Sequence, residues 1–274
     1  MTIIDNNTNN ALQQWLDHRE QLMTIDGTAT DVLYNEAITL CNTLHKQLAT
    51  VADRDEYIAF LSTYANLCAL REENNNKEID IQEEIVTCRR RQVDANGSEY
   101  ISRLSRSLFY AAQLHRKATN VHRAMECMEE HLELERAIAE QDAANGVKNV
   151  AVAQYFMANT YAAFGRNILA EEAYCDAIEL FGKLVDDNNN DMALSMTLVQ
   201  IIIEFADFHL ASRMINNAID RYMQAIEMLR GLALRSDEAL SMLREQYKFM
   251  HSLYNQLGNE KMCTYFAQLI EELN

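Results

Sequence analysis

Proline is absent from this chain of 274 residues, and glycine occurs only seven times. Average usage would supply roughly a dozen prolines. Tight β-turns depend on these two residue types, so a chain poor in both cannot easily build sandwiches, barrels or propellers from many short strands. The composition therefore argues against an all-β fold and favours a helical one.

Basic residues are outnumbered, because 24 Lys and Arg stand against 41 Asp and Glu, a formal net charge of −17. Nucleic acid and anionic lipid repel such a chain, so we expect no nucleic-acid or membrane partner. The opening segment MTIIDNNTNNALQQW lacks the basic start and apolar core of a secretory signal. No run reaches the roughly 18 apolar residues of a membrane span, and Glu204 and Asp207 interrupt the longest. We therefore expect a cytoplasmic protein.

Sequence motifs of enzymes are also missing. The chain has no G-x-S-x-G, P-loop, G-x-G-x-x-G or H-E-x-x-H motif. Its six cysteines form no C-x-x-C pair, and we expect them to be small packing residues rather than disulfides. Cys127 and His131 lie four apart on one helix face, but we expect both in a helical core. The sequence predicts no catalytic activity, no metal and no cofactor; an enzyme whose site has no recognisable motif is the alternative.

Apolar residues recur at intervals of three and four, which predicts α-helix almost throughout. A clear instance is the series Ala153, Phe156, Met157, Tyr161 and Phe164. Short stretches rich in Asn, Asp and Gly interrupt the pattern at residues 24–31, 73–76, 94–98 and 186–191. These residue types cap and end helices without proline. The fold class that follows is all-α.

One segment shows an internal repeat: MANTYAAFGRNILAEEAYCDAIELF, residues 157–181. Its spaced small and aromatic residues are Ala158, Tyr161, Gly165, Ala170, Tyr174 and Ala177. The segment resembles the tetratricopeptide repeat (TPR), a pair of antiparallel helices. In that pattern small residues let the two helices approach closely, and aromatic residues fill the space between hairpins.

The second half of this pattern recurs along the chain. Ala218, Tyr222 and Ala225 repeat it fully, and looser copies begin at Thr30, Ile81, Ala124 and Cys263. The spacing of roughly 45 residues exceeds the 34 of the standard repeat and is similar to the longer repeats of kinesin light chains and related bacterial proteins. The resemblance implies a right-handed TPR-like superhelix of about six antiparallel helical hairpins, forming one domain over residues 1–274. A four-helix bundle is the alternative, which this many helices fit poorly.

A basic island lies between Val86 and Arg123, where eight Lys and Arg face only two acidic residues. Within it, one face of a helix predicted over 100–117 carries Arg103, Arg106, Tyr110, Gln113 and Lys117. Another face carries the apolar series Leu104, Leu108 and Ala111 with His115, which we expect to pack in the core. In the resembled family the first helix of each hairpin lines a concave groove, which implies a basic and aromatic stripe there. The alternative is a solvated outer face or a set of internal partners for neighbouring acids.

The next first helix would present Tyr155 and Asn159. Such an asparagine resembles the one that holds the peptide backbone in peptide-binding TPR proteins, whereas Phe156 replaces the second asparagine of the chaperone-tail clamp. The sequence thus predicts a scaffold or adaptor that binds a protein or peptide, with an acidic segment as a candidate partner. A peptide-sensing regulator whose superhelix changes on binding is the alternative, although no helix-turn-helix output segment is found. No pattern predicts an oligomeric state.

Overall fold

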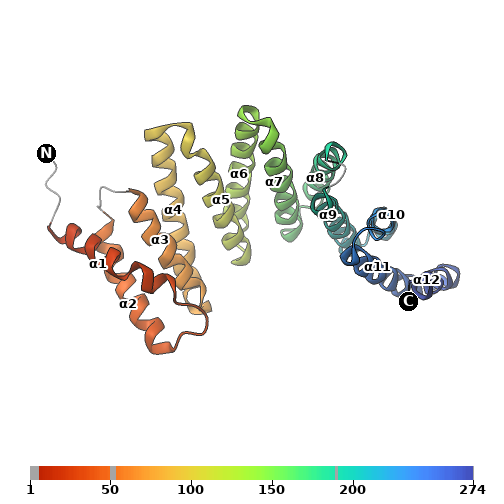
Figure 1. Cartoon of the computed structure of the whole chain (residues 1–274), viewed down its shortest axis with the longest axis horizontal. Helices are drawn as coiled ribbons and strands as arrows, with labels where there is room; N and C mark the ends of the chain where they lie inside the picture. The colour runs from red at the N-terminus through yellow and green to blue at the C-terminus, as the bar shows by residue number, and fades with distance from the viewer. Residues whose placement is uncertain (1–5, 50–53, 189–190, 274) are drawn as a thin grey trace. The chain divides into compact units, whose positions relative to one another are not determined.

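A computed structural model describes residues 6–49, 54–188 and 191–273 (Figure 1). Within these ranges the chain forms twelve α-helices and two short 3-10 helices, with no strand. The predicted all-α fold is confirmed. The chain divides into two compact units, Met1–Ile138 and Ala139–Asn274, which are described separately as unit 1 and unit 2. The single domain and the handedness of the superhelix stay predictions.

The helices follow one another with short connections. Unit 1 contains α1 (Asn6–Met23), α2 (Asp31–Leu48), α3 (Arg54–Ala69), α4 (Asn75–Asn96), α5 (Ile101–Lys117) and most of α6 (Val121–Gln141). Unit 2 contains α7 (Ala143–Ala163), α8 (Asn167–Asp187), α9 (Met192–Ala211), α10 (Ile215–Leu232), α11 (Asp237–Gln256) and α12 (Glu260–Glu272). The 3-10 helices span Glu72–Asn74 and Ser98–Tyr100.

The predicted helix breaks fall at helix ends, although residues 189 and 190 of the last one lie outside the described residues. Side chains cap two of the helices that follow. Thr30 Oγ1 accepts a hydrogen bond from the Leu33 amide at 3.4 Å, and Asp191 Oδ1 accepts one from the Leu194 amide at 3.0 Å. Each cap satisfies a backbone donor that the first turn of a helix leaves free.

Successive helices pack as hairpins, because α1 contacts α2, α3 contacts α4, and the same holds for α7 with α8, α9 with α10 and α11 with α12. Helices α5 and α6 are joined through Ser105 Oγ, which lies 2.7 Å from Nδ1 of His131. The described residues therefore form the predicted set of six helical hairpins.

Four hairpins share one turn geometry. The second residue after the first helix takes a positive φ, at Thr119 (57°), Gly165 (68°), Arg213 (62°) and Gly258 (69°). The next amide then donates to a carbonyl five residues back, as Arg166 does to Tyr161 at 2.9 Å. This backbone closure is a common end of helices. The four turns also fix which residues of different hairpins are equivalent.

Alanines mark where the two helices of a hairpin cross. Ala170 and Ala177 on α8, and Ala218 and Ala225 on α10, are fully buried. They occupy the positions at which the repeat pattern requires small side chains. The predicted role of these alanines as close contacts is consistent with their complete burial.

We expect Ala177→Leu to lower the free energy of unfolding by about 1–3 kcal/mol, because the added methyl groups overpack a filled core. Ala163→Leu, at the exposed end of α7, is the matched control and should change stability by less than about 0.5 kcal/mol. Urea titrations followed by circular dichroism measure both. Equal midpoints for the two variants would show that the hairpin tolerates a large residue at position 177.

Helix α9 is the single helix among the described residues that is long and apolar enough to cross a membrane by length and composition. Half of its apolar stretch is buried inside the structure, as in a core helix. Its buried residues include Ile202, Phe205 and Ala206, and it packs against α10. The expectation of no membrane partner stays a prediction.

Candidate partner-binding surface

Helix α5 begins after a tight reversal of the chain. Helix α4 ends at Asn96 and is followed by Gly97, whose φ of 80° suits a glycine. The 3-10 turn Ser98–Tyr100 then leads directly into α5. The face predicted to be buried is buried, since Leu104, Leu108, Ala111 and His115 each expose 5% or less.

The opposite side of α5 is open. We call its five predicted residues the α5 surface: Arg103, Arg106, Tyr110, Gln113 and Lys117. All are exposed except Gln113, which is half-buried. Tyr110 is 55% exposed, and its ring meets that of Phe109 edge-on with centroids 5.8 Å apart. The structure thus places an aromatic ring among cations on one solvent-facing side of unit 1.

The cations of the α5 surface differ in how far the protein itself neutralises them. Arg103 lies 3.5 Å from Asp55 on α3, and its guanidinium is over the Tyr100 ring at 5.1 Å. Among the described residues, Arg106 and Lys117 make no ion pair within 4 Å. Burial raises the pKa of Glu78 on α4, and the charge of Lys117 acts on that carboxyl in the opposite direction, so Arg106 is the cation of the α5 surface that the described residues neutralise least.

Gln113 is the member of the α5 surface that is least free. Its side-chain oxygen accepts a hydrogen bond from Arg116 at 2.7 Å. Its Nε2 is buried without a hydrogen bond among the described residues. A side chain held in this way offers a partner less than the cations beside it.

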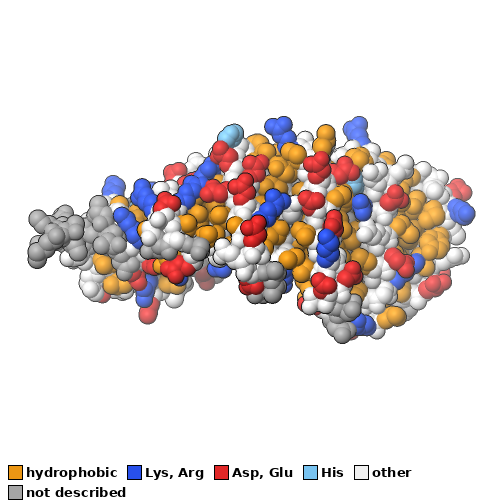
Figure 2. All heavy atoms as spheres, turned by 90° about the horizontal axis from the view of Figure 1, so that it is seen from above, with side chains coloured by type: hydrophobic (Ala, Val, Ile, Leu, Met, Phe, Trp, Pro, Cys, Tyr) orange, Lys and Arg blue, Asp and Glu red, His pale blue; other side chains and the backbone are white. Residues whose placement is uncertain are grey.

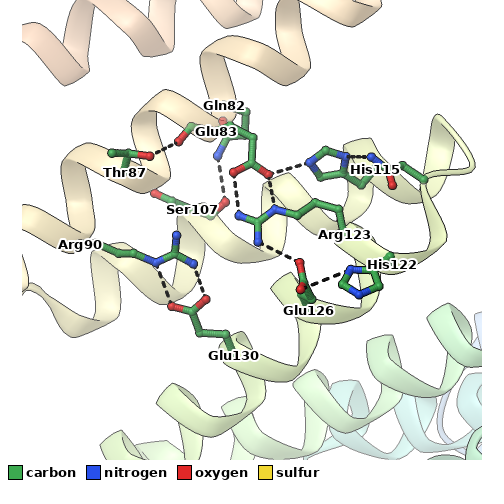
Figure 3. Close-up of polar contacts among 11 residues, drawn as sticks. Gln82, Glu83, Thr87, Arg90, Ser107, His115, His122, Arg123, Glu126 and Glu130 are labelled. Carbon is green, nitrogen blue, oxygen red and sulfur yellow. Dashed lines mark hydrogen bonds and ion pairs between the residues drawn. The ribbon is translucent and has the colours of Figure 1, made fainter.

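Other bases of the island turn inward and pair with acids about 40 residues away (Figure 3). Arg123 donates from Nε and from its terminal nitrogen to the two oxygens of Glu83, each at 2.7 Å. His115 Nε2 lies 2.7 Å from the same carboxylate. Burial acts to raise the pKa of Glu83, but the hydrogen bonds from Arg123 and His115 outweigh it and hold the pKa below its ordinary value.

Two further arginines of the island also pair with carboxylates of the protein. Arg90 pairs with Glu130 of α6 through a forked contact, and Arg89 lies 3.2 Å from Asp55. On the face shown in Figure 2, acidic and basic side chains are interspersed. Arg89, Arg90 and Arg123 thus have carboxylate partners within the protein, as does Arg103 of the α5 surface, whereas Arg106 and Lys117 lie exposed on the helix. The role of the α5 surface in binding a partner stays a prediction.

Tyr155 and Asn159 belong to α7 in unit 2. The Tyr155 hydroxyl donates to Glu204 at 2.5 Å, and Asn159 Oδ1 accepts a hydrogen bond from the Tyr174 hydroxyl at 2.5 Å. Tyr222 makes the same type of bond to Asp207 in the next hairpin. The Asn159 oxygen thus joins the two helices of its own hairpin. The role of these two residues in a groove stays a prediction.

A buried polar cluster between α5 and α6 was not predicted as such. Ser105 Oγ donates to Glu135 at 2.5 Å and also lies 2.7 Å from Nδ1 of His131. Exposure is 0% for Ser105 and 7% for the other two. The constellation has the residue types of a hydrolase triad, but no substrate reaches a serine that is fully buried. The expected core position of His131 and Cys127 is confirmed.

The turns assign equivalents of this cluster in the next hairpin. They are Ala151, Ala177 and Phe181, all buried apolar residues. The signal in the sequence is therefore a polar residue at each of three positions that the repeat reserves for the core. Taken together, the three polar residues predict a buried polar cluster. Each of them alone only makes its repeat look like an imperfect copy of the pattern.

This cluster predicts a dependence of stability on pH. Burial lowers the pKa of His131, although Glu135 acts in the opposite direction. The unfolded chain carries this histidine at its ordinary value near 6.5 and binds the proton more readily than the folded chain. The stability present above about pH 6.5 is therefore lost as pH falls below it.

We expect the urea midpoint of the wild-type chain to fall between pH 7.5 and 5.5, and that of His131→Gln to fall less over the same range. Carboxylates such as Glu83, whose pKa lies below its ordinary value, do not titrate in this window. His209 also has a pKa lowered by burial, and it contributes equally to both proteins. Parallel pH profiles for the two proteins would contradict the prediction.

Metal-ligating residues do not gather in the described part of the chain, where no group of three or more His, Cys, Asp or Glu could hold an ion. All six cysteines are free. The packing role predicted for them is wrong for Cys175, which is exposed on α8, and Cys263 is only partly buried. The absence of a metal or cofactor requirement stays a prediction.

Comparison with known proteins identifies the fold. No known sequence family and no curated protein matches this chain. Among solved structures, BtubC from P. vanneervenii is similar over all of this chain and 91% of its own, with a TM-score of 0.56 and 13% identity. The kinesin light chain TPR-like repeats from Podosopora anserina cover 85% of this chain and 100% of their own, with a TM-score of 0.51 and 15% identity.

RapI in its apo form is also similar, over 97% of each chain, with a TM-score of 0.52 and 12% identity. At identities this low the likeness concerns the fold alone. Taken with the hairpins and their shared turns, it shows that this chain has the fold of TPR-like repeat proteins. The resemblance to the longer kinesin light chain repeats is confirmed at that level.

Proposed function

We propose that this chain is a cytoplasmic scaffold that binds a protein or peptide and has no catalytic activity, and that the α5 surface binds an acidic segment of the partner. The fold supports the general part of this proposal, because stacked hairpins present extended surfaces that suit other chains. No nucleic-acid or membrane partner forms part of it, since the chain carries a formal net charge of −17.

A single observation carries the acidic partner. Arg106 and Lys117 are exposed and without an ion pair in the described structure, while Arg89, Arg90 and Arg123 of the same island have carboxylate partners within the protein. The carboxylates of the protein therefore pair with only part of the basic island, and the exposed side of α5 keeps cations without such a partner. In a chain with this excess of acids, two such cations on one face of a helix are a site for outside carboxylates.

The geometry of the α5 surface also suggests how a segment is held. Complementary charges speed up the association of two partners and fix their relative orientation more than they increase the affinity of the complex. The exposed Tyr110 ring adds apolar contact area at low entropic cost, as aromatic residues do in interfaces. We therefore propose binding that weakens as salt rises, since exposed charges are screened beyond about 10 Å at 0.1 M ionic strength.

Charge reversal tests the proposal. We expect Arg106→Glu with Lys117→Glu to abolish capture of the partner from cytosol in a pull-down read by mass spectrometry, because repulsion replaces attraction at two positions. The melting temperature should change little, since exposed charges contribute less than about 1 kcal/mol. A single stoichiometric protein supports the scaffold, whereas a small co-purified peptide supports the peptide-sensing alternative.

A matched control separates the α5 surface from net charge. Lys46→Glu with Arg136→Glu makes the same change in charge on α2 and α6, at exposed residues without an ion pair in the described structure. This control should capture the partner like the wild-type chain. If the α5 double variant stays folded and still captures every partner, the binding surface lies elsewhere and the proposal is wrong.

A further inference from the structure

Unit 1 carries a cavity of about 300 Å³ between α1 and α3. Trp15, Leu22 and Leu67 line it and are buried, so they form an apolar floor. Met23, which also lines the cavity, is 67% exposed and stands at its mouth. An apolar cavity of about 150 Å³ accommodates benzene, so one of about twice that volume suits a ligand of about twelve non-hydrogen atoms.

Arg19 lines the mouth of this cavity and is only partly engaged within the protein. Its Nη1 lies 3.3 Å from Oε1 of Glu56, longer than the roughly 2.7–2.9 Å of a strong guanidinium–carboxylate bond. Among the described residues, its Nε and its second terminal nitrogen have no hydrogen-bond partner. These two nitrogens form the planar fork that matches the two oxygens of a carboxylate. The Arg19 side chain is 40% exposed, so a ligand in the cavity reaches it.

Glu56 holds the wall of the cavity in place without lining it. Its Oε2 accepts a hydrogen bond from the Trp15 ring nitrogen at 3.1 Å. The Trp15 ring also meets the Phe60 ring edge-on, with centroids 5.4 Å apart. The one polar atom of the indole is therefore satisfied inside the protein, and its apolar surface is left to the cavity.

The remaining polar residues of the lining differ in what they offer a ligand. Ser62 and Thr63 donate their hydroxyl hydrogens to carbonyl oxygens of α3 one turn earlier, at 2.8 and 3.2 Å. The Asn66 side chain is exposed and makes no hydrogen bond among the described residues. The groups free to bind a polar head are therefore the Arg19 fork and the Asn66 amide, both at the mouth.

We propose that the α1–α3 cavity is a binding site for a small organic acid with an apolar body, of the class of aryl-substituted short-chain carboxylates. The body lies on the floor of Trp15, Leu22 and Leu67. The carboxylate lies at the mouth, where it pairs with the free fork of Arg19 and accepts a hydrogen bond from Asn66. An apolar pocket with a few placed polar groups is the usual form of a small-molecule site. The site is independent of the proposed function, because no residue of the α5 surface lines it.

Trp15 is the only tryptophan of the chain, so its fluorescence reports directly on the cavity. The test titrates phenylbutyrate, which has about twelve non-hydrogen atoms, into the intact chain. We expect a saturable change in the Trp15 emission, with a dissociation constant of about 1 mM or lower. Butyrate lacks the apolar body and should leave the emission unchanged.

Two probes with the same body but another head group test the carboxylate. Phenylbutanol should bind about fivefold more weakly than phenylbutyrate, because it lacks the charge-assisted bonds to Arg19. Phenylbutylamine should bind more weakly still, since its charge has the same sign as that of Arg19. This order of affinities is the signature of an acid site.

Arg19→Gln should remove the preference for the acid. We expect phenylbutyrate to bind this variant with the affinity of phenylbutanol, and phenylbutanol itself to change by less than about twofold. Arg136→Gln is the matched control, because it makes the same change at an exposed residue of α6 outside the cavity lining. This control should keep the wild-type order of affinities.

Filling the cavity should weaken every aryl probe. Ala59→Leu adds bulk to the lining and should weaken phenylbutyrate about tenfold, whereas Ala69→Leu, at an exposed position of the same helix outside the lining, should change it by less than about twofold. If Ala59→Leu does not fold, Met23→Ser at the mouth takes its place. Its control is Val32→Ser, since the two residues are 67% and 69% exposed and Val32 lies outside this cavity.

The outcomes decide each part of the inference. No saturable change in Trp15 emission with phenylbutyrate overturns the site. Equal affinity for the acid and the alcohol, or a preference that survives Arg19→Gln, overturns the organic acid as the ligand class. Binding that is unchanged in the cavity variants places the probe elsewhere and overturns the site as well. All of these results leave the α5 surface and its pull-down test unaffected.

Discussion

Gly146→Ala should destabilise this protein strongly, although alanine is the better helix former. Gly146 is buried in the first part of α7, opposite the last turn of α6. A Cβ at this position would lie 2.2 Å from the Cα of Ala139 and 2.5 Å from its Cβ. The obstacle includes backbone, which no rotamer change can move, so the two helices must separate.

We expect a loss of about 3 kcal/mol in the free energy of unfolding, at the upper end of the range for overpacked positions. Without the clash the same substitution would stabilise a helix by about 0.5–1 kcal/mol. The sign of the effect therefore reports the close approach directly. Urea titration followed by circular dichroism measures it.

Gly182→Ala is the matched control. Gly182 lies inside α8, and nothing would come within 4 Å of an added Cβ. This substitution should raise the free energy of unfolding by about 0.5–1 kcal/mol. If both glycine variants gain stability, the close contact between Gly146 and Ala139 does not exist in solution.

The different effects expected for Gly146→Ala and Gly182→Ala show which part of the fold can be predicted from the sequence. Helical spacing predicts the hairpins, and small residues such as Ala177 predict where their helices cross. Neither pattern distinguishes Gly146 from Gly182, because both stand inside a helical segment. The distinction depends on what lies across from each residue in space.

The turns show the same limit. Glycine stands at positions 165 and 258, just past the end of a first helix, and Gly165 belongs to the repeat pattern that predicts a hairpin there. The equivalent positions are Thr119 and Arg213, which take the same positive φ without the residue type that favours it. In these two hairpins the packing of the helices, not the turn residue, fixes the connection.

The candidate surface was predictable in part. The spacing of residues along α5 predicts that Arg106 and Lys117 lie on a different face from the core residues. In the structure both are exposed, whereas the core residues of α5 are buried. The partners of Arg90 and Arg123 are Glu130 and Glu83, about 40 residues away in opposite directions along the chain. Local pattern carries no information on such pairs, because they depend on how one hairpin packs on the next.

Ser105→Ala should destabilise the hairpin of α5 and α6 by about 1–3 kcal/mol, the usual effect of leaving buried polar groups without a partner. Ser105 is the shared partner of His131 and Glu135. Glu135 Oε2 already lacks a hydrogen bond among the described residues. Removing the hydroxyl leaves both remaining side chains buried with fewer hydrogen bonds.

The triple variant Ser105→Ala, His131→Ala and Glu135→Phe should reverse this loss. It installs the residues found at the equivalent positions of the next hairpin, where Ala151, Ala177 and Phe181 form an apolar core. Replacing a buried polar cluster by packed apolar groups is often neutral or stabilises by about 1–4 kcal/mol. The triple variant should therefore be more stable than Ser105→Ala and at least as stable as the wild-type chain.

The comparison of these two variants decides what the cluster contributes. Urea midpoints at pH 7.5 give the order of stability of the variants. Between pH 7.5 and pH 5.5 the urea midpoint of the triple variant should change less than that of Ser105→Ala, because the triple variant lacks His131. A triple variant less stable than Ser105→Ala would mean that this hairpin requires its polar core for packing. In that case the cluster is a specific structural element of the hairpin and not a polar version of the repeat core.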